Sequence, residues 1–155
     1  MTVAVGRKVP DFEVPVTGGG TFRLSEALGQ PLVLYFYPKD MTTGCTRESQ
    51  DFRDLHADFL EAGAVVVGIS RDSLKSHENF RAKYELPFPL IADTDEAVCN
   101  LYGVIKQKNM YGKQVRGIER STFLIDAYGR LVQEWRGVKV PGHASEVLQA
   151  ARSIG

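Results

Sequence analysis

The sequence has no long hydrophobic run, no excess of charge of one sign and little cysteine. Its longest apolar runs, Leu32–Tyr37 and Ala64–Ile69, are far shorter than the ~20 residues needed to cross a bilayer. Nineteen basic residues balance 19 acidic ones, so no net field attracts the chain to nucleic acid or to anionic lipid. Because the first residues also lack a secretory pattern, we expect a cytoplasmic protein without nucleic-acid or membrane partners.

The scarcity of cysteine and histidine excludes further classes of protein. Cys45 and Cys99 are the only cysteines, too few for the disulfide framework of a small secreted domain, and we expect both to be free thiols. The absence of a Cys-x-x-Cys motif argues against a thioredoxin-type dithiol reductase. Three scattered histidines and no glycine-rich phosphate loop after a strand leave no motif for a metal ion or a bound cofactor, so we predict neither.

What is present indicates a globular α/β protein. The 155 residues, 43% of them hydrophobic, suit one domain spanning residues 1–155. Alternation, apolar runs and capping residues predict, in order, a β-hairpin (Glu13–Val16 and Thr21–Leu24), a strand (Leu32–Tyr37), a helix (Thr46–Ala62), a strand (Ala64–Ser70), a helix from Asp72 and Ser73 to Tyr84, a strand (Leu90–Ala92), a short helix (Asp93–Tyr102), an exposed basic loop (Val104–Gly117), a hairpin (Ile118–Ile125 and Arg130–Trp135) and a helix (His143–Ile154). Strands alternating with helices before an antiparallel hairpin predict a mixed central sheet flanked by helices, the thioredoxin-like fold, with an N-terminal β-hairpin.

The turn after the first long strand carries a candidate nucleophile. Cys45 lies near the first turn of the predicted helix, where unpaired backbone N–H groups and the helix dipole stabilise a thiolate. Gly44 permits a close backbone approach or a positive φ angle, and Pro38 fixes the entry of the loop. Thr42 places a hydroxyl three residues before the sulfur, where it can donate to the thiolate or accept from a substrate oxygen. From these residues alone, an ordinary buried cysteine beside a helix-capping threonine explains the segment equally well.

The segment Pro38-Lys-Asp-Met-Thr42-Thr-Gly-Cys45 resembles the Pro-x-x-x-Thr-x-x-Cys signature of peroxiredoxins. The flanking Tyr-Phe-Tyr-Pro-Lys-Asp and Gly-Cys-Thr-x-Glu are similar to the bacterioferritin comigratory protein, or peroxiredoxin Q, subfamily. The likeness extends from Val9-Pro-Asp-Phe through Arg120-Ser-Thr-Phe-Leu-Ile-Asp-Ala-Tyr-Gly to the final helix. This resemblance implies a thiol peroxidase, an antioxidant enzyme of cell redox homeostasis.

The resemblance also implies roles for individual residues. Cys45 would attack the O–O bond of hydrogen peroxide or an organic hydroperoxide and become a sulfenic acid. Thr42 would orient the peroxide, Pro38 would shield the sulfur, and Arg120 would stabilise the thiolate and the departing oxygen. The implied substrate-binding residues are Thr42, Gly44, Cys45 and Arg120. The alternative for Arg120 is an exposed arginine on a strand, and Glu48 is either its ion-pair partner or an exposed helix residue.

Two positions differ from the family pattern. Thr43 stands where the subfamily usually has proline, and Gln50 stands where many relatives have the resolving cysteine. Cys99 is the one other thiol and therefore the candidate resolving residue, although packing within a helix also explains it. Three routes for reducing the sulfenic acid stay open: attack by Cys99 after local unwinding, attack by an external thiol, which we favour, and an intersubunit disulfide.

We therefore predict a peroxiredoxin that is reduced by a thioredoxin- or glutaredoxin-type donor and acts as a monomer or a weak dimer. Two other functions stand as alternatives. One is a redox-regulated interaction or chaperone module in which Cys45 is a slow sensor, and the other is a thiol transferase acting on mixed disulfides. Rapid loss of the thiol with peroxide would separate the peroxidase from the sensor.

Overall fold

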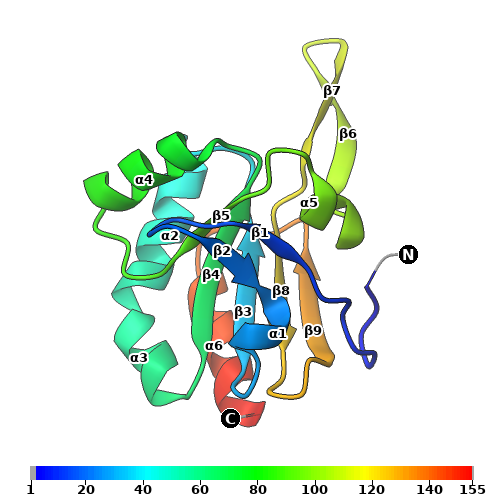
Figure 1. Ribbon diagram of the computed structural model, residues 1–155. Helices are drawn as coiled ribbons and strands as arrows, with labels where there is room; N and C mark the ends of the chain where they lie inside the picture. Colours follow the sequence, from blue (N-terminus) through cyan, green and yellow to red (C-terminus); the bar gives the residue numbers. More distant parts are fainter. Residues whose placement is uncertain (1–2, 155) are drawn as a thin grey trace.

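A five-stranded mixed sheet forms the centre of the computed structural model, which describes residues 3–154 (Figure 1). The strand order is β5-β4-β3-β8-β9. These strands are β3 (Leu32–Phe36), β4 (Val65–Ser70), β5 (Leu90–Ala92), β8 (Ser121–Ile125) and β9 (Leu131–Arg136). The first three in the chain are parallel, and β8 and β9 run antiparallel to their neighbours. Met1, Thr2 and Gly155, at the ends of the predicted domain, lie outside the described residues.

Helices flank the sheet and two separate hairpins complete the fold. The helices are α1 (Leu24–Ala27), α2 (Thr43–Asp54), α3 (His56–Glu61), α4 (Leu74–Lys83), α5 (Ala97–Leu101) and α6 (His143–Ile154). The hairpins pair β1 (Glu13–Pro15) with β2 (Thr21–Arg23), and β6 (Ile105–Met110) with β7 (Lys113–Ile118). This arrangement confirms the predicted thioredoxin-like fold with an N-terminal hairpin. Within residues 3–154, no helix combines the length and the apolar character that a membrane span requires.

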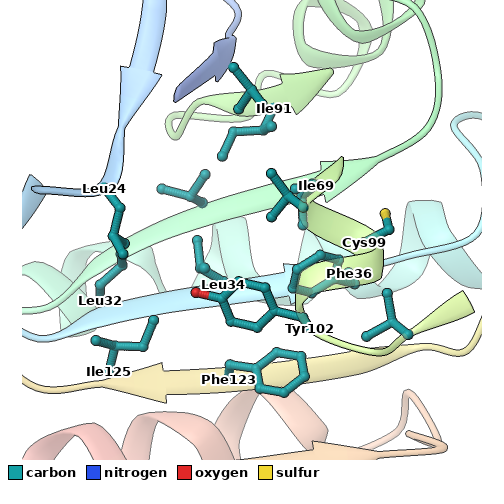
Figure 2. Close-up of a cluster of buried hydrophobic side chains, with 14 of the residues drawn as sticks. Leu24, Leu32, Leu34, Phe36, Ile69, Ile91, Cys99, Tyr102, Phe123 and Ile125 are labelled. Carbon is teal, nitrogen blue, oxygen red and sulfur yellow. The ribbon is translucent and has the colours of Figure 1, made fainter. Parts of the chain in front are cut away.

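The sheet separates two hydrophobic cores. Side chains alternate along β3, so Leu34 and Phe36 enter one core while Val33 and Tyr35 enter the other. The N-terminal hairpin, α1 and α5 cover the first core, which Figure 2 shows around Phe36. Helices α2, α3, α4 and α6 cover the second core. Complete burial of each such side chain contributes about 1.5–3 kcal/mol, which explains why β3 is apolar on both faces.

The helix predicted over Thr46–Ala62 is wrong in two respects. It begins earlier, at Thr43, and Leu55 divides it into α2 and α3. Leu55 adopts φ −99° and ψ 4°, outside the helical region, although its side chain continues the apolar spacing. The earlier start places Cys45 fully inside the first helical turn. The terminating role of Gly63 is confirmed by its φ of 79°.

The predicted loop Val104–Gly117 is also wrong, because this segment forms the β6–β7 hairpin. Its strands pair in register from Ile105↔Ile118 to Met110↔Lys113 and extend away from the body of the molecule (Figure 1). Tyr111 and Gly112 both have positive φ, as a two-residue hairpin turn requires. The strands lack apolar alternation because most of the hairpin is exposed, so periodicity gave no signal.

The helix predicted over Asp93–Tyr102 is shorter than expected and begins at Ala97. The Asp93 carboxylate accepts hydrogen bonds from the backbone N–H groups of Val98 and Cys99, so the preceding residues form a turn instead of helix. Glu96, the residue before the helix, has a φ of 65°. Asp93 thus replaces the first turn of the expected helix with a side-chain cap.

The strand directions determine where a site can form. β3 and β4 are parallel neighbours, so the segments that follow them leave the sheet at the same edge. β8 runs antiparallel to β3, and Ser121 at its beginning pairs with Phe36 at the end of β3. Arg120, which precedes β8, therefore reaches the edge at which α2 begins.

Candidate active site

Cys45 is the third residue of α2 and its thiol is buried at the start of that helix. Thr42 occupies the N-cap position with extended backbone angles, and its carbonyl accepts the N–H of Thr46 at 2.9 Å. The first N–H groups of a helix have no acceptor within it, and their dipoles favour an anion at this end. Cys45 is a free cysteine with 1% exposure, so these dipoles act on its sulfur with little screening by water.

Arg120 connects the sulfur to a buried carboxylate. Its Nη2 donates to Cys45 Sγ at 3.5 Å and its Nη1 donates to Glu48 Oε1 at 2.6 Å. The side chain of Arg120 is 17% exposed and that of Glu48 is 1% exposed. The ion pair is therefore confirmed, and the alternatives of an exposed arginine and an exposed glutamate are wrong. A Cβ atom on Gly44 would lie 3.1 Å from Arg120 Nη2, so this glycine provides a close approach within a helical backbone, not a positive φ.

Burial and the mutual attraction of the two groups shift the pKa values of Glu48 and Arg120. Burial raises the pKa of Glu48 to about 7, against the opposing attraction of Arg120. For Arg120, burial disfavours the charged form, but the charges of Glu48 and Cys45 outweigh it and raise the arginine pKa. Glu48 Oε2 is buried without a hydrogen-bond partner among residues 3–154. The sulfur thus faces a guanidinium that stays charged and can stabilise an oxyanion formed beside it.

Thr42 and Pro38 lie on the loop between β3 and α2. The Thr42 hydroxyl donates to the carbonyl of Lys39 at 2.8 Å and does not cap the helix. Because its one proton is already donated, the hydroxyl has lone pairs left to accept a hydrogen bond from a substrate. Pro38 is half-buried and contributes to a hollow of about 390 Å³ whose other lining residues are Lys39, Arg71, Asp72, Thr94 and Glu96.

Cys99 lies on the other side of the sheet from Cys45. It packs in the core that Figure 2 shows around Phe36 and Tyr102, whereas Cys45 belongs to the core under α2. Burial, together with the neighbouring Asp93 carboxylate, raises the pKa of the Cys99 thiol far above its ordinary value. The structure does not bring the two sulfurs together, and unwinding α2 alone leaves the sheet between them.

Sequence reasoning missed a polar cluster behind the loop. His77, treated as one of three scattered histidines, is buried on α4, and its Nδ1 lies 2.7 Å from Oδ2 of Asp40. The available signal was topological: α4 follows β4, the parallel neighbour of β3, so both connections share one sheet edge. His56 is half-buried at the start of α3, and His143 is buried with Nε2 2.8 Å from Thr122 Oγ1.

The chain is similar to known proteins along most of its length. Residues 5–134 match the model of the AhpC/TSA family. The chain is 49% identical over 154 residues to peroxiredoxin Bcp of Bacillus subtilis, covering 99% of this chain and 98% of the relative. It is 54% identical over 143 residues to peroxiredoxin Bcp of Xanthomonas campestris, covering 92% and 89% of the two chains.

A solved structure of the Xanthomonas campestris bacterioferritin comigratory protein, described in terms of its alkyl peroxide reduction activity, is similar in fold as well. It matches with a TM-score of 0.91 and 51% identity, covering 97% of this chain and 98% of that one. The chain belongs to the AhpC/TSA family and, within it, to the bacterioferritin comigratory protein or peroxiredoxin Q group of thiol-dependent peroxidases.

Proposed function

We propose that Cys45 is the residue through which this peroxidase reduces hydrogen peroxide and organic hydroperoxides. The thiolate sulfur attacks the terminal oxygen of the hydroperoxide, so that an S–O bond forms while the O–O bond breaks. The attacked oxygen keeps its proton and becomes the sulfenic acid hydroxyl. The other oxygen leaves with the bonding electrons and takes up a proton from solvent to become water or an alcohol.

The observation that carries this proposal is the contact between Arg120 and the sulfur. A partly buried guanidinium 3.5 Å from Sγ, ion-paired to the buried Glu48, is already placed where negative charge moves from sulfur to oxygen. The backbone N–H groups in the first turn of α2 are further hydrogen-bond donors beside Cys45. An ordinary packing cysteine needs neither a neighbouring guanidinium nor a helix N-terminus.

Thr42 is proposed to position the substrate and Pro38 to shield the sulfur. With its proton given to the Lys39 carbonyl, the Thr42 hydroxyl is oriented to accept the O–H of a bound hydroperoxide. That hydrogen bond would turn the terminal oxygen toward Cys45. The half-buried ring of Pro38, two residues after the end of β3, would limit the access of water to the same loop.

The sulfenic acid is proposed to be reduced by an external dithiol of the thioredoxin or glutaredoxin type. One donor thiol attacks the Cys45 sulfur, forming a mixed disulfide and releasing water, and the second donor thiol then releases the Cys45 thiol. The position of Cys99 across the sheet and Gln50 on α2 support this route over an intramolecular one. Two free thiols also fit a reducing, cytoplasmic environment.

Mass spectrometry after one equivalent of hydrogen peroxide tests the proposal. We expect a sulfenic-acid trap to label Cys45 in the wild type and equally in Cys99→Ala, with no bond between Cys45 and Cys99. Cys45→Ser is the control and should take up no trap at that position. An unmodified Cys45 in the wild type would overturn the proposed nucleophile, and a Cys45–Cys99 disulfide would overturn the proposed external reduction.

A further inference from the structure

A second buried polar cluster lies behind the loop between β3 and α2. Asp40, between Pro38 and Thr42, is 4% exposed and His77 on α4 is 0% exposed. Nδ1 of His77 lies 2.7 Å from Asp40 Oδ2, and its Nε2 lies 2.9 Å from the carbonyl oxygen of Ile91 on β5. The imidazole ring of His77 thus links Asp40 on the loop to the backbone of β5.

The hydrogen-bond partners of His77 determine how many protons His77 and Asp40 hold together. A carbonyl oxygen only accepts, so Nε2 of His77 must donate to Ile91. The contact of 2.7 Å between Nδ1 and Asp40 Oδ2 then needs a further proton, on the nitrogen or on the oxygen. Either way the pair shares one proton and has no net charge, which suits its complete burial.

Asp40 is held by its neighbours as well as by His77. The Tyr37 hydroxyl donates to Oδ1 at 2.7 Å and the Ser76 hydroxyl donates to Oδ2 at 2.8 Å. The backbone N–H of Asp40 donates to Asp72 Oδ2 at 2.9 Å. Ligand atoms of Asp40, Asp72 and His77 lie within 4.8 Å of one another, but these hydrogen bonds already engage them, so the cluster reads as a loop anchor and not as a metal site.

The residue after Asp40 shows why an anchor is needed. Met41 has a φ of 66°, a left-handed conformation that costs a non-glycine residue about 1–2 kcal/mol, and its side chain does not stabilise it by burial because Met41 is 44% exposed. Thr42 follows immediately, and the first turn of α2 with Cys45 comes next. The hydrogen bonds of Asp40 thus hold the residue next to a left-handed turn that leads directly to Thr42.

We propose that Asp40 and His77 are positioning residues for the peroxidase reaction. Through the shared proton, His77 fixes Asp40, and Asp40 fixes the turn that presents Thr42 and the first turn of α2 to the hydroperoxide. This role rests on the proposed function of Cys45. A positioning role differs from a merely structural one in its effect on rates. Loss of the positioning residue slows the reaction of Cys45 with peroxide more than its reaction with other thiol reagents.

Two substitutions of one residue separate the two hydrogen bonds of His77. The amide nitrogen of His77→Asn can take the place of Nδ1 and still donate to Asp40, whereas that of His77→Gln can take the place of Nε2 and donate to Ile91. Both remove the imidazole and its shared proton. His56→Gln, on a half-buried histidine away from the loop, is the control.

Two rates are measured for each reduced variant, the loss of the Cys45 thiol with hydrogen peroxide and its alkylation by iodoacetamide. We expect His77→Gln to slow the peroxide reaction by about 10- to 100-fold, as misplacement of a catalytic loop does, while alkylation is as fast as in the wild type or faster. His77→Asn should recover most of the peroxide rate, and His56→Gln should match the wild type in both assays.

Each opposite result has a definite meaning. Equal slowing in His77→Asn and His77→Gln, a wild-type peroxide rate in His77→Gln, or a parallel fall of both rates would overturn the positioning role. If both histidine variants fail to fold, Tyr37→Phe removes one donor to Asp40 while keeping the buried ring, and an unchanged peroxide rate in that variant would also overturn it. A wild-type Cys45 that forms no sulfenic acid would instead contradict the proposed function itself.

Discussion

At the scale of single residues, Arg120 must satisfy two partners at once. Its Nη1 donates to Glu48 and its Nη2 donates to the Cys45 sulfur. The fork of a guanidinium can do this with one rigid group, whereas the ammonium of lysine is a single point charge on a flexible chain. The position therefore needs the shape of arginine as well as its charge.

Arg120→Lys should slow the reaction of Cys45 with hydrogen peroxide by about 100-fold, the usual effect of losing one donor to a developing oxyanion. Stopped-flow measurement of thiol loss gives the rate. Arg47→Lys on the exposed side of α2 is the control and should react like the wild type, because the ion pair of Arg47 with Asp51 lies at the surface. A wild-type rate for Arg120→Lys would mean that charge alone is sufficient.

The part of the candidate site that lies in a sequence motif could be predicted from the sequence. The resemblance of the motif predicted Cys45, Thr42 and Pro38 as site residues, and the resemblance further along the chain predicted Arg120. Sequence did not decide whether Glu48 was exposed, because helix spacing places it one turn after Cys45 without showing what covers it. His77 was missed because its partner Asp40 is 37 positions away and only the packing of α4 beside the loop brings them together.

At the scale of elements, one glycine in the first turn of α2 leaves room for the Arg120 guanidinium. Gly44 has helical backbone angles, so alanine is compatible with its conformation and stabilises a helix by up to about 1 kcal/mol. The added Cβ would, however, lie 3.1 Å from Arg120 Nη2, which is closer than ordinary contact. The same substitution therefore has opposite effects on the helix and on the site.

We expect Gly44→Ala to keep or raise the free energy of unfolding and to slow the peroxide reaction by displacing the guanidinium. Urea denaturation measures the first effect and thiol loss the second. Gln50→Ala, on the same helix, controls for the change in helix composition and should leave the peroxide rate unaltered. Wild-type reactivity in Gly44→Ala would show that Arg120 tolerates the extra methyl group.

Sequence patterns predicted buried elements better than exposed ones. β3 and β4 follow from continuous apolar runs, because only strands covered on both faces need them. The β6–β7 hairpin lacks apolar alternation, a pattern that predicts a loop, because most of its residues are exposed and its two strands pair with each other. The sequence also gives no signal for the division of the predicted helix at Leu55, because a residue with bridge-region backbone angles does not interrupt the spacing of apolar side chains.

At the scale of the whole molecule, two buried groups oppose each other in the pH dependence of stability. Burial raises the pKa of Glu48 to about 7, so between its ordinary value and pH 7 the folded chain holds a proton that the unfolded chain has released. The free energy of unfolding then falls as pH rises. Burial lowers the pKa of His143 to about 4, so between pH 4 and 6.5 the unfolded chain binds a proton that the folded chain excludes, and the free energy of unfolding rises with pH.

Because the two ranges overlap between about pH 4.5 and 6.5, where each group changes stability by about 1 kcal/mol per pH unit, their contributions cancel in the wild type. Glu48→Gln should expose the rising slope of His143, and His143→Gln should expose the falling slope of Glu48. Urea denaturation at half-unit steps from pH 4.5 to 7.5 measures this, and subtracting the wild-type curve removes the contribution of all other groups. Parallel curves for Glu48→Gln and the wild type would show that Glu48 is ionised throughout this range, held in that state by Arg120 despite its burial.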